Sequence, residues 1–196
     1  VIPIGKWVLE EACRQAKFWR DTGYLSFKMS VNVSVVQFRQ RDFVAQVIET
    51  LEESGLPPEC LELEVTETVV ADDVERIRKI LEALKSLGIG ITLDDFGTGY
   101  SSLSYLTLLP FDKLKIDQAF VREADWKKWE IVRAVTNLSR SLGLDVVAEG
   151  IETLDSLDQL RNVGCHLGQG YYFSKPIAPK DFERFMRDIA DGKQFH

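Results

Sequence analysis

Several residue types are scarce in this chain, and each scarcity excludes a class of protein. Its 196 residues include two histidines, of which His196 is the last residue, so a histidine-rich zinc or iron site is disfavoured. The three cysteines, Cys13, Cys60 and Cys165, are far apart and odd in number. This pattern fits reduced core residues of a cytosolic protein better than a disulfide framework or a thiolate metal site.

Long apolar runs and an excess of positive charge are missing as well. No apolar run approaches the ~20 residues of a membrane span, and no signal-peptide pattern opens the chain. We therefore expect a cytoplasmic domain, and membrane anchoring of a parent protein through a missing N-terminal region stays open. The net charge of −7 argues against polymeric nucleic acid as a partner, whereas an anionic small ligand would need local cations to receive it.

The composition predicts one domain over residues 1–196. A hydrophobic content of 45% is enough for one sizeable core, and no linker, low-complexity tract or internal repeat divides the chain. The first residue is Val1 rather than methionine, so we expect that the true start is missing.

Apolar, β-branched runs alternate with amphipathic segments along the whole chain. Largely continuous apolar runs are typical of strands buried on both faces of a parallel sheet. The amphipathic segments end at glycines such as Gly88 and Gly164, which is typical of helices. We predict six strands, at roughly Phe27–Val35, Cys60–Thr66, Ile89–Asp94, Lys113–Asp117, Asp145–Ala148 and Gly164–Tyr171.

Six strand–helix units in series predict an α/β fold. An open doubly wound sheet could hold them, but the phosphate-binding pattern G-x-G-x-x-G is absent after every predicted strand. The segment Gly97-Thr98-Gly99 is too short, and too acidic in context, to replace it. A TIM-like (β/α)8 barrel needs two more strands, which a truncated N-terminus could have carried.

Polar residues gather where the predicted strands end. The pair Asp94-Asp95 ends one apolar run, and adjacent carboxylates both stay ionised only if a cation or strong donors offset them. An ordinary Asx-type turn would explain this pair alone. In a barrel, however, the carboxyl ends of all strands converge on one face. The other strand ends carry Asn32 and Ser34, Glu64 and Glu67, Lys115 and Asp117, Glu149 and Glu152, and Gln169.

These residue types favour hard cations. Oxygen ligands suit Mg²⁺ or Mn²⁺, and adjacent aspartates offer one ligand to each of two ions, as in phosphodiester displacement. Lys115 could hold an attacking water or offset developing charge, or it could form a structural ion pair with Asp117 or Asp112. Glu149 could take the proton of that water, provided its pKa suits the task.

Together the motifs resemble those of the EAL-domain family, the cyclic-di-GMP phosphodiesterases. The resemblance covers nearly the whole chain, and its pieces come in family order. It implies a modified TIM barrel that hydrolyses one phosphodiester of cyclic di-GMP to linear pGpG in bacterial second-messenger signalling. The matching pieces are Asn32-Val33-Ser34, Glu64-Val65-Thr66-Glu67, Asp94 to Ser102 (DDFGTGYSS), Lys115-Ile116-Asp117, Glu149 to Thr153 (EGIET) and Gln169-Gly170.

The resemblance implies a role for each matching residue. Lys115 would contact the nucleophilic water, and Glu149 would act as general base or orient that water. The ligands of two Mg²⁺ or Mn²⁺ ions would be Asn32, Glu64 and Asp94, with Asp95 reaching the second ion. The metal and ligand surroundings would be completed by Asp117, Glu152 and Gln169.

The resemblance also implies a regulatory loop and partners. Glu67 would hold the loop Phe96-Gly97-Thr98-Gly99, which in the family couples the active site to dimerisation. The implied partners are cyclic di-GMP, a second copy in a homodimer, and an upstream sensor or diguanylate cyclase domain in the parent protein.

One departure from the family pattern concerns the tripeptide Glu-Ala-Leu, which is absent ahead of Asn32-Val33-Ser34; the copy at Glu82-Ala83-Leu84 lies in an amphipathic segment and not on a predicted strand. In the family it lies upstream of the matching region, on the second barrel strand, where its Glu is a metal ligand and a nearby Arg binds substrate phosphate. We expect an N-terminally clipped chain that lacks the first two strands and is weakly stable and inactive alone. The alternatives are a catalytically inactive cyclic-di-GMP receptor, a dimerisation module, or an enolase-like barrel.

Overall fold

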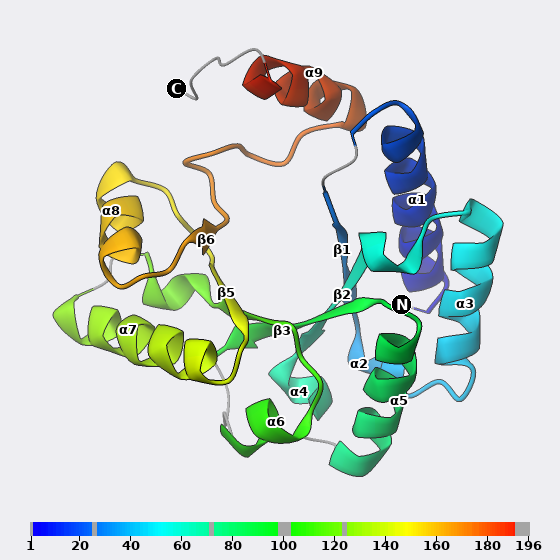
Figure 1. Cartoon of the computed structure of the whole chain (residues 1–196), viewed down its shortest axis with the longest axis horizontal. Coiled ribbons are helices and arrows are strands. Elements are labelled where there is room, and N and C mark those ends of the chain that lie inside the picture. The colour runs from blue at the N-terminus through cyan, green and yellow to red at the C-terminus, as the bar shows by residue number, and fades with distance from the viewer. Residues whose placement is uncertain (1, 25–26, 71–72, 98–102, 123–124, 191–196) are drawn as a thin grey trace.

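The computed structural model describes residues 2–24, 27–70, 73–97, 103–122 and 125–190. Within these residues, six strands form one parallel sheet in chain order, with helices around its outer side (Figure 1). This is the arrangement of a TIM-like barrel, so the predicted α/β fold is confirmed. The strands are β1 Met29–Val33, β2 Leu61–Thr66, β3 Gly90–Phe96, β4 Lys113–Ile116, β5 Asp145–Ala148 and β6 Leu167–Gly168.

All six predicted strands are present, but the predicted ranges of β1, β2, β4 and β6 are too long, and β3 continues past its predicted end to Phe96. β6 is shorter than the predicted run because Gly164, with φ 80°, still belongs to the turn after the preceding helix. β4 ends at Ile116, since Asp117 caps a short 3₁₀ helix by accepting a hydrogen bond from the Ala119 amide. Boundaries of this kind depend on side-chain caps and on the partner strand, which apolar patterning does not report.

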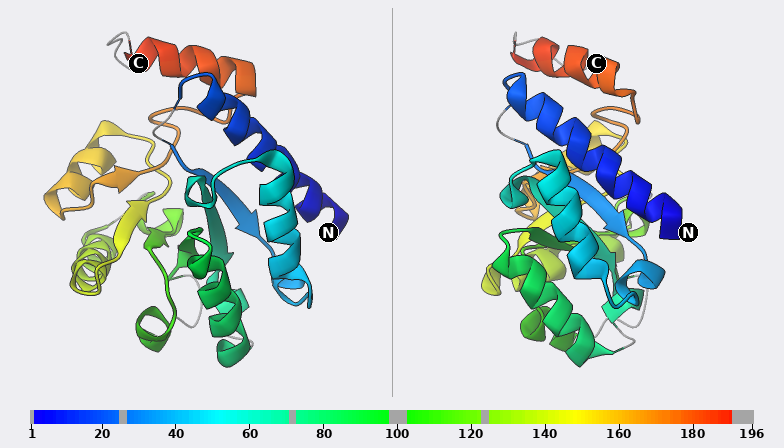
Figure 2. Two further views of the ribbon diagram at one scale, coloured as in Figure 1. Left: turned by 45° about the vertical axis from the view of Figure 1, so that its right-hand side comes forward. Right: turned by 90° about the vertical axis from the view of Figure 1, so that its right-hand side faces the viewer.

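The helices follow the strands and cover the outside of the sheet, as Figure 2 shows from two further sides. α1 packs against β1, α5 against β3 and α7 against β5. The helices are α1 Ile2–Asp21, α2 Val35–Phe38, α3 Phe43–Ser54, α4 Glu67–Val70, α5 Val74–Ser86, α6 Leu103–Leu108, α7 Trp126–Ser141, α8 Leu154–Asn162 and α9 Pro179–Ala190, with 3₁₀ turns η1 Pro58–Cys60 and η2 Gln118–Phe120. None of the helices in the described ranges combines the length and apolar character of a bilayer crossing.

Side-chain alternation divides the sheet into an outer apolar face and an inner polar face. Leu61, Leu63 and Val65 of β2 are fully buried in the apolar core. The intervening Glu62 and Glu64 are also buried, and they contact lysines of β4 across β3. Side chains of two strands that flank a third meet only on the inner side of the curved sheet, so charged residues face the interior.

β1 and β6 are the two edges of the described sheet. On this side of the molecule, α9 lies next to the end of α1 (Figures 1 and 2). The Trp19 ring contacts the Phe182 ring at 4.5 Å, and its indole N–H donates to the Glu183 carboxylate at 3.0 Å. These contacts hold the last described helix against the first.

Candidate metal centre

Lys115 is the centre of a buried ion cluster at the carboxyl ends of the strands. It is 5% exposed, and its ammonium lies 2.8 Å from Glu64 Oε2, 3.1 Å from Asp94 Oδ1 and 2.7 Å from Glu149 Oε1. These carboxylates belong to β2, to β3 and to the residue after β5. A lysine has three N–H donors, so each carboxylate can take one. The alternative that Lys115 pairs with Asp112 is wrong, because Asp112 pairs with Lys85.

A β-bulge turns the Asp94-Asp95 pair toward this cluster. Leu93 pairs with Leu114, and the next register pair is Phe96 with Ile116, so both aspartates oppose the single residue Lys115. Asp95 adopts φ 57°, the one positive value among the described non-glycine residues. Adjacent strand residues normally point to opposite faces, and a bulge re-aims one of them.

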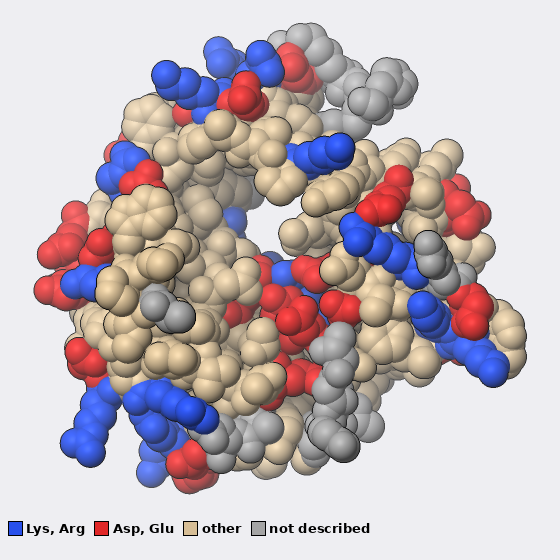
Figure 3. All heavy atoms as spheres, turned by 180° about the vertical axis from the view of Figure 1, so that it is seen from behind, with Lys and Arg blue, Asp and Glu red and all other residues tan. Residues whose placement is uncertain are grey.

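The bulge creates a group of carboxylates that could hold a metal ion. One carboxylate oxygen each from Asp94, Asp95 and Glu149 lies within 4.8 Å of the others. The Asp95 amide also donates to Asp94 Oδ1 at 3.0 Å, so an Asx-type contact and a ligand group coexist in this segment. Figure 3 shows Asp and Glu side chains gathered in the hollowed centre of the face opposite to the view of Figure 1.

The pKa values of the cluster reflect its surplus of carboxylates. Burial, and then the charges of Asp94 and Asp117, raise the pKa of Asp95. Burial also raises the pKa of Glu149, although the hydrogen bond from Lys115 opposes this. Burial alone would lower the pKa of Lys115, but hydrogen bonds to Glu149 and Glu64 outweigh it and the pKa is raised. A hard divalent cation fits this oxygen-only, negatively charged donor group, because it would offset the surplus.

The structure places the other predicted site residues on β1 and on the segments that follow β4, β5 and β6. Asn32 is exposed on β1, in register with Glu64. Asp117 follows β4, and its charge acts on Asp95. Glu152 forms an ion pair with Arg122 at the surface. Gln169 lines a small pocket together with Glu149 and Arg122.

The start of the predicted regulatory loop is tied to Glu67. The Gly97 amide donates to Glu67 Oε1 at 3.3 Å, and Phe96 is buried in the core. Gly97 has φ 98°, and a Cβ placed there would meet the Phe120 ring at 2.7 Å. Thr98 and Gly99 lie outside the described residues.

One part of the interior was not predicted from the sequence. Glu62 and Lys113 form an ion pair at 2.7 Å on the same inner face as the metal centre. Glu62 precedes Glu64 by two residues, and Lys113 precedes Lys115 by two. The signal was present, because Leu61-Glu62-Leu63-Glu64 and Lys113-Leu114-Lys115 both alternate charged and apolar residues, which is the strand period.

The fold and the site define a class of protein, a TIM-like α/β barrel with an acidic, lysine-centred site at the carboxyl ends of its strands. Comparison with known proteins gives the family. The sequence profile of the EAL domain matches residues 1–176. The chain belongs to the EAL domain family.

Its relatives include larger signalling proteins. The chain is 43% identical over 192 residues to the bifunctional diguanylate cyclase/cyclic di-GMP phosphodiesterase MucR of Pseudomonas aeruginosa, covering 97% of this chain and 28% of that protein. It is 42% identical over 188 residues to the signaling protein YkoW of Bacillus subtilis, covering 95% of this chain and 23% of YkoW. The chain therefore spans about a quarter of the length of these relatives.

Solved structures agree with this family assignment. The PaMucR phosphodiesterase in complex with c-di-GMP superposes with a TM-score of 0.89 at 42% identity, covering 92% of this chain and 74% of that one. BlrP1 of Klebsiella pneumoniae, in its manganese/cy-diGMP complex, gives a TM-score of 0.79 at 34% identity, covering 89% of this chain and 45% of that one.

Proposed function

We propose that this chain forms the catalytic part of a metal-dependent phosphodiesterase that hydrolyses cyclic di-GMP to linear pGpG. The observation that carries the proposal is the meeting of carboxylate oxygens of Asp94, Asp95 and Glu149; the carboxylates of Asp94 and Glu149 also contact the Lys115 ammonium. The named activity of MucR and the cyclic-di-GMP complexes of the similar structures support the choice of substrate.

The residues present suit one or two Mg²⁺ or Mn²⁺ ions. Asp94, Asp95 and Glu149 would hold the metal together with Glu64 and Asn32, and Asp117, Glu152 and Gln169 would complete the surroundings of the metal and the ligand. Such ions would supply charge stabilisation of the phosphodiester and a more acidic bound water. A bulged pair of aspartates can face two ions at once, which an ordinary strand cannot arrange.

Lys115 and Glu149 would handle the water and its proton. The Lys115 ammonium is held by three carboxylates, so it stays charged and can orient a water or offset charge on a phosphate oxygen. Burial raises the pKa of Glu149, which makes it a stronger base for a proton of the attacking water. Glu67, through Gly97, would position the loop that begins at Phe96.

We further propose that the active barrel contains two strands beyond the six described, between β1 and β6. The supporting observation is that these two strands are the edges of the described sheet. By resemblance, the added segment would bring the family's Glu ligand and its phosphate-binding Arg. In this proposal residues 1–196 alone are inactive, and the parent protein carries the domain as a homodimer in the cytoplasm or at a membrane, with an upstream sensor or diguanylate cyclase domain.

Product analysis tests the proposed function. The parent domain is incubated with cyclic di-GMP and Mg²⁺ or Mn²⁺, and the nucleotides are separated by chromatography. We expect pGpG to accumulate, and a chelator to stop it. Tight binding of cyclic di-GMP without any product would identify a receptor instead, and neither binding nor turnover would reject both functions.

A further inference from the structure

The Glu62–Lys113 pair occupies a position that a barrel interior normally fills with aliphatic side chains. The Glu62 side chain is 4% exposed and that of Lys113 is 22% exposed, and their charged atoms lie 2.7 Å apart. The second Glu62 oxygen accepts a hydrogen bond from Ser30 Oγ at 3.1 Å. A buried ion pair generally contributes no more stability than apolar residues of the same size, so this one calls for another explanation.

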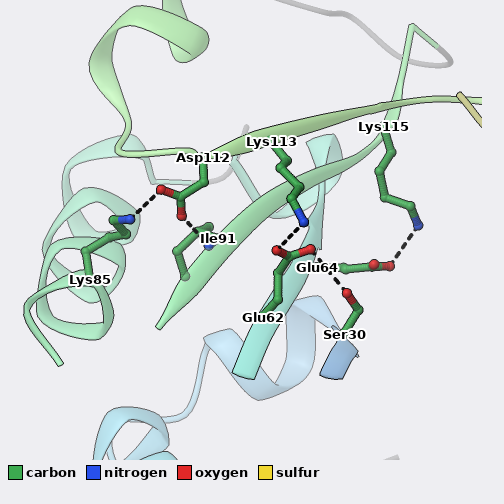
Figure 4. Close-up of polar contacts among 8 residues, drawn as sticks. All are labelled: Ser30, Glu62, Glu64, Lys85, Ile91, Asp112, Lys113 and Lys115. Atoms are coloured by element: carbon green, nitrogen blue, oxygen red, sulfur yellow. Dashed lines mark hydrogen bonds and ion pairs between the residues drawn. The ribbon is translucent and has the colours of Figure 1, made fainter. Parts of the chain in front are cut away.

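The pair lies directly beneath the metal centre. Figure 4 shows Lys113 and Lys115 extending from β4 toward Glu62 and Glu64 of β2, as two parallel ion pairs. Successive residues on one face of a strand are about 6.6 Å apart, so the Glu62 carboxylate is within reach of the long, flexible Lys115 side chain. Lys113 is the cation that occupies Glu62 in the structure.

Thr92 gives a displaced ammonium a second place to bind. This residue is fully buried on β3, in register with Glu64 on one side and Lys113 on the other. It shares the inner face with Asp94, two residues further along the strand. Within the described part of the chain, its hydroxyl oxygen has no hydrogen-bond partner. An acceptor is therefore available between the two ion pairs.

We propose that Lys113 is a positioning residue for Lys115. By neutralising Glu62, it leaves the Lys115 ammonium to Glu64, Asp94 and Glu149, where the attacking water would be. Without Lys113, the Lys115 ammonium moves toward the unpaired Glu62 carboxylate and the Thr92 hydroxyl, and away from Glu149. The kinetic consequence rests on the proposed phosphodiesterase function, whereas the displacement of Lys115 does not.

The kinetic test compares Lys113→Met with the double variant Glu62→Gln/Lys113→Met in the parent domain. Misplacing a catalytic group by about 1 Å costs on the order of 100-fold in rate, so we expect Lys113→Met to lower kcat at least about tenfold. We expect KM for cyclic di-GMP to stay within about twofold, because the Glu62–Lys113 pair does not itself bind the substrate. The double variant recovers most of the lost kcat, since the competing carboxylate is gone.

Lys85→Met is the matched control. It removes the lysine of the Lys85–Asp112 ion pair, which lies outside the inner face, so it lowers stability without changing kcat (Figure 4). If Glu62–Lys113 is only structural, Lys113→Met lowers the melting temperature but the folded variant keeps the wild-type kcat, and the proposal is overturned.

A second readout needs no turnover. In the metal-free protein, we expect the side-chain resonance of Lys115, assigned through Lys115→Met, to shift in Lys113→Met, to return toward wild type in the double variant and to stay fixed in Lys85→Met. An unmoved resonance in Lys113→Met overturns the proposal even if hydrolysis changes. A wild-type domain that releases no pGpG rejects the proposed function alone, and the resonance still decides the positioning role.

Discussion

At the scale of single residues, the metal centre depends on backbone conformations that most residues avoid. Asp95 adopts φ 57°, and Gly97 two residues later adopts φ 98°. Aspartate tolerates the left-handed region better than most residues, and glycine enters it freely. The sequence singled out the acidic pair and the glycine after it, but it did not show why these residue types are needed there. The structure gives the reason, which is the positive φ of Asp95 and Gly97 where the chain changes direction.

Gly97→Ala tests this arrangement against a matched glycine. Gly143 also has a positive φ, 74°, but has open space where a Cβ would project, whereas at Gly97 the Cβ would meet the Phe120 ring. We expect Gly143→Ala to lower the free energy of unfolding by about 1 kcal/mol. Gly97→Ala should cost about 1–3 kcal/mol more, because overpacking adds to the backbone strain. Urea unfolding followed by circular dichroism measures both, and equal losses would contradict the predicted role of Phe120.

At the scale of elements, Lys115 joins four strand ends into one site. Apolar patterning found the strands, although only β2 and β3 are buried on both faces along most of their length, whereas β1, β5 and β6 are partly or wholly exposed. It did not find the bulge, because the register of β3 against β4 depends on the partner strand as much as on the residues of β3. Period-two reasoning would have placed Asp94 and Asp95 on opposite faces.

The partners of Lys115 show a similar limit. The sequence indicated that Lys115 and the acidic residues share one end of a barrel, but left open an ion pair with Asp117 or Asp112. The distances to Glu64, Asp94 and Glu149 depend on how strongly the sheet curves. Curvature is a property of all six strands, and no single motif contains it.

Lys115→Met should destabilise the metal-free protein and abolish hydrolysis. Removing one partner of a buried ion cluster costs about 3–5 kcal/mol, because the remaining charges are left uncompensated. We expect Mn²⁺ to restore part of the lost melting temperature, since a divalent cation can replace the missing positive charge. Thermal unfolding with chelator and with Mn²⁺ measures this. A variant that melts like wild type in chelator would show that the cluster does not depend on Lys115.

At the scale of the whole molecule, β1 and β6 are edges of the described sheet, and α9 meets α1 on this side. The sequence predicted the six strands and their barrel-like order, because parallel strands joined by helices leave few other topologies. The sequence does not indicate what covers these two edges, because that depends on which segments pair with β1 and β6.

The proposal of two additional strands predicts that residues 1–196 are less stable than a longer polypeptide that supplies those strands. Unpaired strand edges leave backbone donors and acceptors open and favour association between chains. We expect a lower melting temperature, concentration-dependent aggregation and no pGpG release with Mg²⁺. Calorimetry, light scattering and nucleotide chromatography on both polypeptides check this. Equal stability and turnover in residues 1–196 would reject the proposal of two additional strands.

The central claim is that the bulged aspartates at the Lys115 centre hold the metal used for hydrolysis. The Mn²⁺ dependence of cyclic di-GMP hydrolysis by the parent domain, compared between wild type and Asp95→Asn, tests it most directly. The account predicts that Asp95→Asn raises the half-saturating Mn²⁺ concentration at least about tenfold, because a charged ligand becomes neutral. An unchanged Mn²⁺ dependence in Asp95→Asn, at any level of activity, would contradict it.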